Sequence, residues 1–151
     1  MAEFEPRNPD FAAVVRHSFD RQPFMALMGA DLISVAPGRC EIGLDHRRDL
    51  TQQHGYIHGG AIGAIIDSAM GYAAFSLAAT GSAVLTVEYK INLVAPADGM
   101  RLVARGEVAR AGRTLIVSRG EVFAVQEGAE ILCAVASQTV MILSHRDDKP
   151  A

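Results

Sequence analysis

The spacing of apolar residues changes from a helical to an extended pattern near Gly81. After Gly81 apolar and polar residues alternate with a period of two, which is typical of β-strands that bury one face. The first alternating strand is predicted to carry two sets of residues on opposite faces: Leu85, Val87, Tyr89, Ile91 and Leu93 on one, and Thr86, Glu88, Lys90 and Asn92 on the other.

Three more strands are predicted after this one, at Leu102–Arg110, Thr114–Val125 and Glu130–Leu143. The connections between them centre on Ala111-Gly112 and Glu127-Gly128. Connections this short can join only antiparallel strands, because a parallel crossover needs a dozen or more residues.

Two helices and a hairpin are predicted in the first third of the chain. Asn8 is expected to cap the first helix, with Pro9 in its first turn and one apolar face that runs as far as Phe19. A second, short helix is expected at Pro23–Met28, ended by Gly29. A strand hairpin is then predicted from two short segments: Leu32–Val35 and Arg39–Asp45.

A long helix is predicted from Gly59 to about Ala79, and its residues are apolar or small on every side. A helix without a polar face is buried all round. Gly63 and Gly71 are expected to thin this helix so that a sheet can wrap it closely. About 20 helical residues span roughly 30 Å, and strands of about 10 residues span roughly 34 Å, so helix and strands match in length.

These lengths favour an α+β fold in which one long central helix is wrapped by a curved antiparallel sheet of five to six strands. A parallel α/β fold is excluded because no helices separate the last four strands. One sheet cannot enclose an all-apolar helix alone, so self-association as a homodimer is expected.

Composition and length predict one soluble domain covering residues 1–151. Residues 1–21 are expected to form an N-terminal helical extension and 144–151 a flexible tail. The net charge of −3 and the lack of a basic stripe argue against a nucleic-acid partner. Cys40 and Cys133 are too few for a disulfide framework or a cysteine-rich zinc site, and are expected to be buried free thiols.

No membrane partner is expected, although one segment is apolar enough to raise the question. From Gly59 to Val87 the only charged residue is Asp67. A central Asp costs about 2.5–3.5 kcal/mol on insertion scales, so a core helix followed by a strand is the better interpretation. The first residues combine acids and prolines where a signal peptide would be apolar, which predicts a cytoplasmic protein.

Asp67 is the first candidate for chemistry. It lies about eight residues inside the predicted helix, too deep for an N-cap, and no basic residue is near it in sequence. Burying an unpaired carboxylate is costly. The alternatives are a carboxylate that reaches solvent or is satisfied in the core, and a carboxylate kept for general-base or nucleophilic catalysis, which we favour.

Gly59 and Gly60 open the helix, where a ligand could approach the backbone without meeting a Cβ. The first N–H groups of a helix lack internal acceptors and carry partial positive charge, so they could polarise an ester or thioester carbonyl. His58 could orient this turn or contact the ligand. Gln52 could hydrogen-bond an attacking water or the carbonyl.

His46, His54 and His58 are the candidates for a metal site. The spacing of four between His54 and His58 is that of a helical metal pair, but Gly55 and the polar flanks place both residues in a loop. No further Cys or His completes a ligand set, and no metal is expected.

The combination of Gln52, Gly55, His58-Gly59-Gly60 and Asp67 resembles the PaaI-type acyl-CoA thioesterases of the hot-dog superfamily. The resemblance covers about residues 22–143. It implies a hot-dog fold and hydrolysis of the thioester of an aromatic or short-to-medium-chain acyl-CoA. Coenzyme A would be part of the substrate, and no other cofactor is implied.

The resemblance also implies roles for the candidate residues. Asp67 would be the general base or the nucleophile, and the Gly59 N–H would polarise the carbonyl. Gln52 would orient water or the carbonyl, and His58 would hold the turn or bind near the thioester. Gly60 and Thr86 would lie close to the substrate.

Further implications concern coenzyme A and assembly. Arg110 and Arg113, on the hairpin Arg110–Leu115, are expected to bind the phosphates of coenzyme A. The acid of one subunit would work beside the glycine turn of its partner, in a homodimer that can pair into a dimer of dimers, a homotetramer. The acyl group is expected to lie against the first helix and three residues of the long one: Ile62, Met70 and Phe75.

Two other functions were kept as alternatives. A hot-dog enoyl-CoA hydratase or dehydratase would use a similar scaffold, but the sequence lacks a second motif of Asp followed five residues later by His. A non-catalytic acyl-CoA binding module would need no carboxylate at Asp67.

Overall fold

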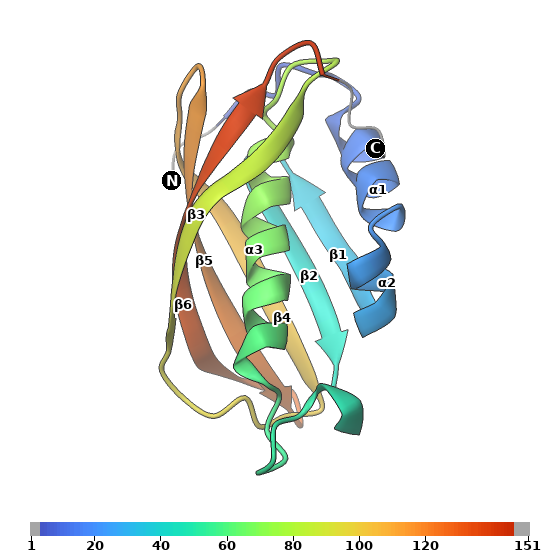
Figure 1. The fold of residues 1–151 in the computed structure, drawn as a ribbon, viewed down its shortest axis with the longest axis vertical. Helices are drawn as coiled ribbons and strands as arrows, with labels where there is room; N and C mark the ends of the chain where they lie inside the picture. Colours follow the sequence, from blue (N-terminus) through green and yellow to red (C-terminus); the bar gives the residue numbers. More distant parts are fainter. Residues whose placement is uncertain (1–3, 147–151) are drawn as a thin grey trace.

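A six-stranded antiparallel sheet curves around one central helix (Figure 1). The computed structural model describes residues 4–146. The strand order is β1-β2-β4-β5-β6-β3. The strands are β1 (Ala30–Ala36), β2 (Arg39–Asp45), β3 (Ala83–Leu93), β4 (Arg101–Ala111), β5 (Leu115–Gln126) and β6 (Ala129–Leu143).

Three α-helices and one 3₁₀ turn accompany the sheet: α1 (Phe11–Asp20), α2 (Pro23–Met28), η1 (Arg48–Leu50) and α3 (Gly59–Phe75). The predicted fold class is confirmed, and β2 and α2 have the predicted bounds. Of the predicted tail 144–151, residues 147–151 lie outside the described part of the chain. Within residues 4–146, none of the helices combines the length and apolarity needed to cross a membrane.

Contact between α3 and the sheet depends on two glycines that face the helix. A Cβ on Gly106 of β4 would lie 2.4 Å from the carbonyl oxygen of Ala69, and a Cβ on Gly120 of β5 would lie 2.4 Å from the Ile66 side chain. Ile66 and Ala69 are fully buried at this contact. The helix therefore lies directly against bare backbone, so the core is thin and tightly packed.

The predicted end of the long helix is wrong by about four residues. α3 ends at Phe75, and Ser76 begins a turn in which Leu77 and Ala78 make i→i−3 bonds. The Ser76 hydroxyl accepts a hydrogen bond from the Gly38 N–H and donates one to the Ala73 carbonyl. Leu77 and Ala78 stay buried, so their apolar character reflects burial and not helical structure.

The predicted start of the first helix is also wrong. α1 begins at Phe11, with Asp10 as its N-cap. Asn8 lies in the turn before it, where its Oδ1 accepts a hydrogen bond from the Asp10 N–H at 3.0 Å. The Asn-Pro signal thus marks an Asx-type turn that leads into the helix.

The predicted faces of β3 are wrong because the strand contains a bulge. Thr86 pairs with Val140 and Glu88 with Thr139, so Val87 has no partner. One extra residue shifts the alternation by one position beyond it. Thr86 and Tyr89 therefore both face α3, although the sequence pattern placed them on opposite faces.

Candidate functional site

The Asp67 side chain lies in the middle of α3, half-buried and opposite the inner face of β3 and β6. Its Oδ1 accepts a hydrogen bond from the Thr86 hydroxyl at 2.9 Å and one from the Gln138 amide at 2.5 Å. Among residues 4–146, no hydrogen bond to Oδ2 is found. The carboxylate is therefore held through one oxygen, and the other is available.

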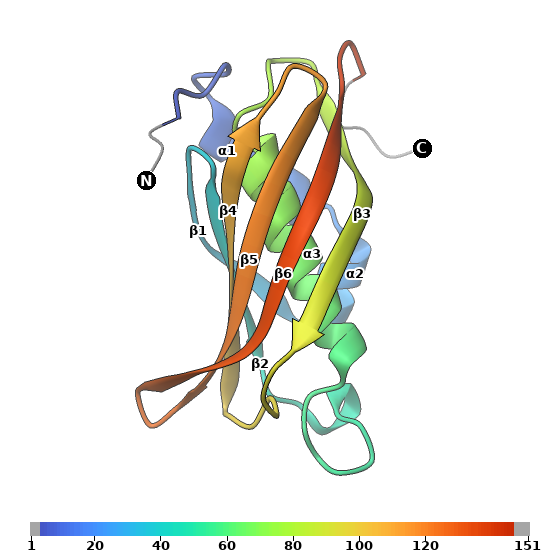
Figure 2. The same cartoon turned by 90° about the vertical axis from the view of Figure 1, so that its left-hand side faces the viewer.

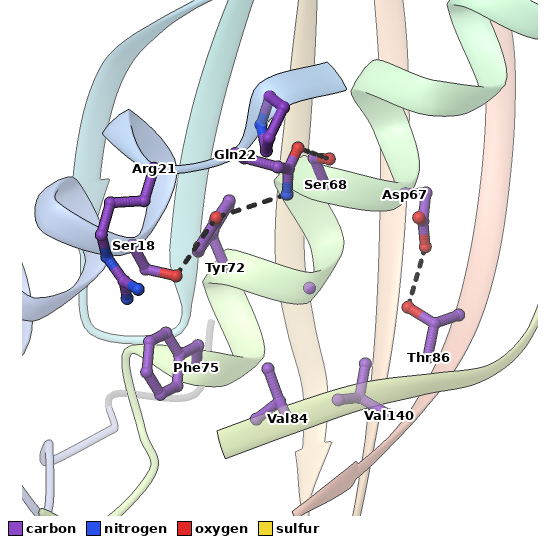
Figure 3. A pocket seen from close by; sticks show the side chains of 12 residues that line it. Ser18, Arg21, Gln22, Asp67, Ser68, Tyr72, Phe75, Val84, Thr86 and Val140 are labelled. Atoms are coloured by element: carbon purple, nitrogen blue, oxygen red, sulfur yellow. Dashed lines mark hydrogen bonds between the residues drawn. The ribbon is translucent and has the colours of Figure 1, made fainter. Parts of the chain in front are cut away.

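A cavity of about 390 Å³ opens beside this carboxylate, between α3, the α1–α2 segment and β3 (Figure 3). Asp67 and Thr86 line one end of the cavity. The rest of the lining combines small or apolar residues, a chain of hydroxyl and amide groups, and one arginine: Pro23, Gly71, Phe75, Val84 and Val140, then Ser18, Gln22, Ser68 and Tyr72, and Arg21. It is shaped for a largely apolar group whose reacting atom lies at Asp67.

Gly71 opens onto this cavity, which makes its predicted packing role wrong. A Cβ on Gly71 would meet nothing within 4 Å, and the residue lines the cavity wall. Gly63 does have the predicted role, since its Cβ would lie 3.1 Å from the Tyr89 hydroxyl. Of the predicted acyl contacts, Phe75 lines the cavity, whereas Ile62 and Met70 are buried and do not.

The start of α3 leaves one backbone N–H available. His58 is the N-cap, and its Nδ1 accepts a hydrogen bond from the Gly60 N–H at 2.8 Å. The N–H groups of Ala61 and Ile62 bond to the His58 carbonyl. In the described part of the chain, the Gly59 N–H has no acceptor, so it is the donor at this helix end that a ligand oxygen could use.

Gln52 lies in the loop that precedes this helix. Its side-chain oxygen accepts from the His54 N–H, and its backbone N–H donates to the Tyr56 carbonyl at 2.9 Å. The amide oxygen is thus engaged in the loop turn. Gln52 is therefore part of the loop before His58, and it does not line the cavity beside Asp67.

Arg110 and Arg113 lie far from the helix start within one subunit. The β4–β5 hairpin is at the upper end of the sheet in Figure 2, and the loop leading into α3 is at the lower end. Both arginines lie at the hairpin and are exposed. Neither lines the cavity beside Asp67. Their role in binding coenzyme A stays a prediction.

Gln138 was missed by the sequence prediction. It lies on β6, is 1% exposed, and its amide nitrogen also lies 3.2 Å from the Thr86 hydroxyl. The sequence holds one signal for this residue. Gln138 alternates in step with Val140 and Ile142 along the strand, so it shares their buried face. A polar residue in an apolar series is a candidate for a specific contact.

Within residues 4–146, neither a metal site nor a cysteine thiol is part of the candidate site. Groups of three or more side chains that could hold a metal ion are absent from residues 4–146. Cys40 and Cys133 are free and buried, as predicted. Burial raises the pKa of the Cys40 thiol to about 12 and also raises that of Cys133.

Comparisons of the sequence and of the structure with known proteins agree on one family. The sequence profile described as "Thioesterase superfamily" matches residues 54–131, more than half of the chain. A thioesterase family protein from Silicibacter pomeroyi is 46% identical, with 89% of this chain and 98% of that one covered and a TM-score of 0.87.

Two further relatives are more distant. The PaaI protein from the phenylacetic acid degradation operon of E. coli has 19% identity, covers 87% of this chain and 94% of that one with a TM-score of 0.75, and shows the shared fold. A protein of Saccharolobus solfataricus, named as a predicted esterase, is 33% identical over 86 residues. That match covers 57% of this chain and about three fifths, 61%, of the relative's length.

The profile match covers the glycine turn at the start of α3, the carboxylate of Asp67 and the strand that carries Thr86. The predicted resemblance to thioesterases with the hot-dog fold is confirmed, and the predicted enzyme class, a hydrolase of thioester bonds, is the class for which this family is named. The chain belongs to the thioesterase superfamily.

Proposed function

We propose that the protein is an acyl-CoA thioesterase that uses Asp67 and the Gly59 N–H on an aromatic or short-to-medium-chain acyl group. The observation that supports it most directly is the state of the Asp67 carboxylate. Oδ1 is held by Thr86, and Oδ2 is available beside a mostly apolar cavity. A positioned carboxylate with an available oxygen is suited to general-base or nucleophilic catalysis.

The reaction consumes one water and releases a carboxylic acid and the thiol of coenzyme A. As a general base, Asp67 takes a proton from water while the water oxygen attacks the thioester carbon. As a nucleophile, Asp67 attacks that carbon itself, expels the thiolate and leaves an anhydride that water then opens. In both routes negative charge develops on the carbonyl oxygen, where the Gly59 N–H would stabilise it.

One subunit cannot provide both groups to one thioester. Gly59 and Asp67 are eight residues apart on α3, which places them roughly 12 Å apart along the helix axis. A hydrogen-bond donor and a base must both lie about 3 Å from the reacting atoms. The proposed site therefore combines Asp67 of one subunit with Gly59 of a second copy.

The β3 edge supports such a dimer. β3 is the last strand of the sheet, so its outer edge is unpaired within residues 4–146. Four of its apolar side chains are between 44% and 58% exposed: Leu85, Val87, Tyr89 and Leu93. An apolar unpaired edge strand is a natural surface for strand pairing with another chain. We propose that two copies meet here.

The catalytic pair is tested by two substitutions that keep the fold. Asp67→Asn should lower kcat roughly 10²–10⁴-fold, because an amide cannot accept the proton or attack. Gly59→Pro deletes the free N–H at the first helical position, where Pro is well tolerated. The extended backbone of His58 (ψ 139°) also suits a following Pro. It should cost roughly 10²–10³-fold in kcat.

Gly59→Ala is the matched control, since it retains the N–H and its Cβ meets only the flexible Leu93 side chain. Release of free thiol is measured with benzoyl-CoA, phenylacetyl-CoA and straight-chain acyl-CoAs from acetyl to decanoyl. Full activity of Asp67→Asn would exclude the proposed mechanism. Hydration of an enoyl-CoA without thiol release would instead favour a hydratase.

The shared site is tested by mixing the two inactive chains. Co-expressed Asp67→Asn and Gly59→Pro subunits form heterodimers with one intact site, because that site takes Asp67 from one chain and Gly59 from the other. Random pairing should restore about a quarter of wild-type activity. If the mixture stays as inactive as either variant alone, the two groups act within one subunit or not at all.

A further inference from the structure

Gln138 contacts three oxygens at the proposed catalytic carboxylate. Its side-chain nitrogen lies 2.5 Å from Asp67 Oδ1, 3.1 Å from the Asp67 carbonyl oxygen and 3.2 Å from the Thr86 hydroxyl. These contacts join β6 to α3 and β3 at one point. The roles proposed above for the glycine turn and for Asp67 do not by themselves assign a function to Gln138.

The chemistry of these neighbours fixes the orientation of the amide. A backbone carbonyl and a carboxylate can only accept hydrogen bonds, so the group facing them must be the NH₂. The amide oxygen then points the other way. It is buried, and within the described residues it has no hydrogen-bond partner.

The unpaired oxygen argues against a purely structural role. A buried acceptor without a partner destabilises the folded chain, and an apolar residue of the same shape would avoid that penalty. Ser118 shows the alternative, because its buried hydroxyl ties β5 to the Met70 carbonyl of α3 without leaving an orphaned atom. Gln138 is therefore better explained by what its NH₂ does at Asp67.

We propose that Gln138 is a positioning residue that, together with Thr86, holds Oδ1 of Asp67 so that Oδ2 faces the substrate. This inference rests on the proposed thioesterase function. The NH₂ of Gln138 and the hydroxyl of Thr86 donate to the same oxygen, so together they fix the rotation of the carboxylate. The other titratable side chains that line the cavity are Arg21 and Tyr72, on the wall away from β6.

The kinetic test uses Gln138→Met, which keeps the length and volume of the side chain and removes both polar ends. We expect kcat to fall roughly 10- to 100-fold with KM within about twofold, because the acid is misplaced while the cavity is intact. The thermal midpoint should stay the same or rise, since the orphaned oxygen is gone. Ser118→Ala is the matched control and should leave kcat unchanged.

A second readout does not depend on activity. The chemical shift of the Asp67 carboxyl carbon is recorded by NMR in wild type, Gln138→Met and Ser118→Ala. Loss of the Gln138 donor should move this chemical shift in Gln138→Met and leave it unchanged in Ser118→Ala.

The outcomes separate the two proposals. If no acyl-CoA is hydrolysed by wild type, the proposed function fails and the NMR comparison alone decides the role of Gln138. If wild type is active but Gln138→Met keeps both its kcat and the wild-type chemical shift of the Asp67 carboxyl carbon, the positioning role is wrong. A lower thermal midpoint together with an unchanged chemical shift would likewise assign Gln138 to folding.

Discussion

The two groups that we propose for catalysis, Asp67 and Gly59, differ in what their local bonds leave available. The carboxylate of Asp67 is restrained, because Thr86 and Gln138 both donate to one of its oxygens. Among residues 4–146 the Gly59 N–H has no acceptor, while the neighbouring Gly60 N–H donates to the His58 ring. The His58 cap therefore determines which of the two N–H groups is available. In the proposed mechanism the base needs a fixed orientation and the oxyanion donor needs an unused N–H, and these local bonds would provide both.

Cys40 should be inert in the folded protein. Burial raises the pKa of its thiol to about 12, so at pH 8 only roughly one molecule in 10⁴ carries the reactive thiolate. We expect native protein to resist iodoacetamide at pH 8, with both cysteines alkylated after unfolding in guanidinium chloride. Stability should fall as pH rises above about 9, because the unfolded thiol loses its proton first. Rapid modification of native Cys40, measured by mass spectrometry, would contradict this.

Residue types and spacing were enough to predict the candidate acid and the glycine turn, whereas the hydroxyl of Thr86 and the choice of the Gly59 N–H came from the family resemblance. Spacing alone could not predict which of the two glycine N–H groups is available, because that depends on the rotamer of His58. Gln138 was missed for a similar reason. It is 71 residues from Asp67 along the chain, and only the folded sheet brings them together.

At the scale of elements, the distance between α3 and the sheet is set by the backbone of β4. Gly106 has no side chain where the Ala69 carbonyl approaches, and the opposing atoms are backbone that cannot move aside. Gly120 faces the Ile66 side chain, which can change rotamer. The position of α3 thus depends most on one residue of a neighbouring strand.

Gly106→Ala should lower the free energy of unfolding by about 2–3 kcal/mol, since the added Cβ pushes the helix away from the sheet. It should also lower kcat, because Asp67 lies on the same turn as the displaced Ala69. Urea denaturation and the thiol-release assay measure the two effects.

Gly71→Ala is the contrasting variant on α3, where a Cβ meets no atom within 4 Å. It should stabilise the chain by about 0.5–1 kcal/mol, since Ala is the better helix former. It should also narrow the cavity and weaken binding of bulky acyl groups. Equal stability of the two variants would show that α3 is free to shift.

Elements were predicted well where a local period identified them, as in the four strands after Gly81. Their ends and faces were predicted less well. The segment after Phe75 is as apolar as the helix itself, and only its bonds to the β1–β2 turn and its i→i−3 contacts end the helix. The bulge in β3 leaves no mark in composition, because Val87 fits the alternating pattern that it interrupts.

At the scale of the whole molecule, the sheet covers one face of α3 and ends in two edge strands. The order β1-β2-β4-β5-β6-β3 makes β1 and β3 the edge strands. The exposed apolar residues of β3 lie on the edge nearest Asp67. Assembly through β3 would therefore cover the edge and complete the proposed site in one step.

Val87→Glu should separate the dimer, because a buried charge at a strand edge disfavours pairing. Wild type should have about twice the 16.1 kDa chain mass by light scattering, and the variant should have the chain mass and little activity. Ile131→Glu is the matched control, with 52% exposure against 55% for Val87 and a position on β6 paired with β5. If Val87→Glu remains dimeric, the subunits meet elsewhere.

The bulge at Val87 gives β3 two phases of alternation, one before it and one after. Up to Thr86 the even-numbered residues face α3, and beyond the bulge the odd-numbered residues, such as Tyr89, do so. The β6 partners of Thr86, Glu88 and Tyr89 are consecutive, so Val87 is a single extra residue in an otherwise regular strand. Deleting Val87 should therefore remove the bulge and leave Thr86 and Tyr89 both facing α3. The regular pairing of β3 with β6 holds the Thr86 hydroxyl at Asp67, with or without the extra residue.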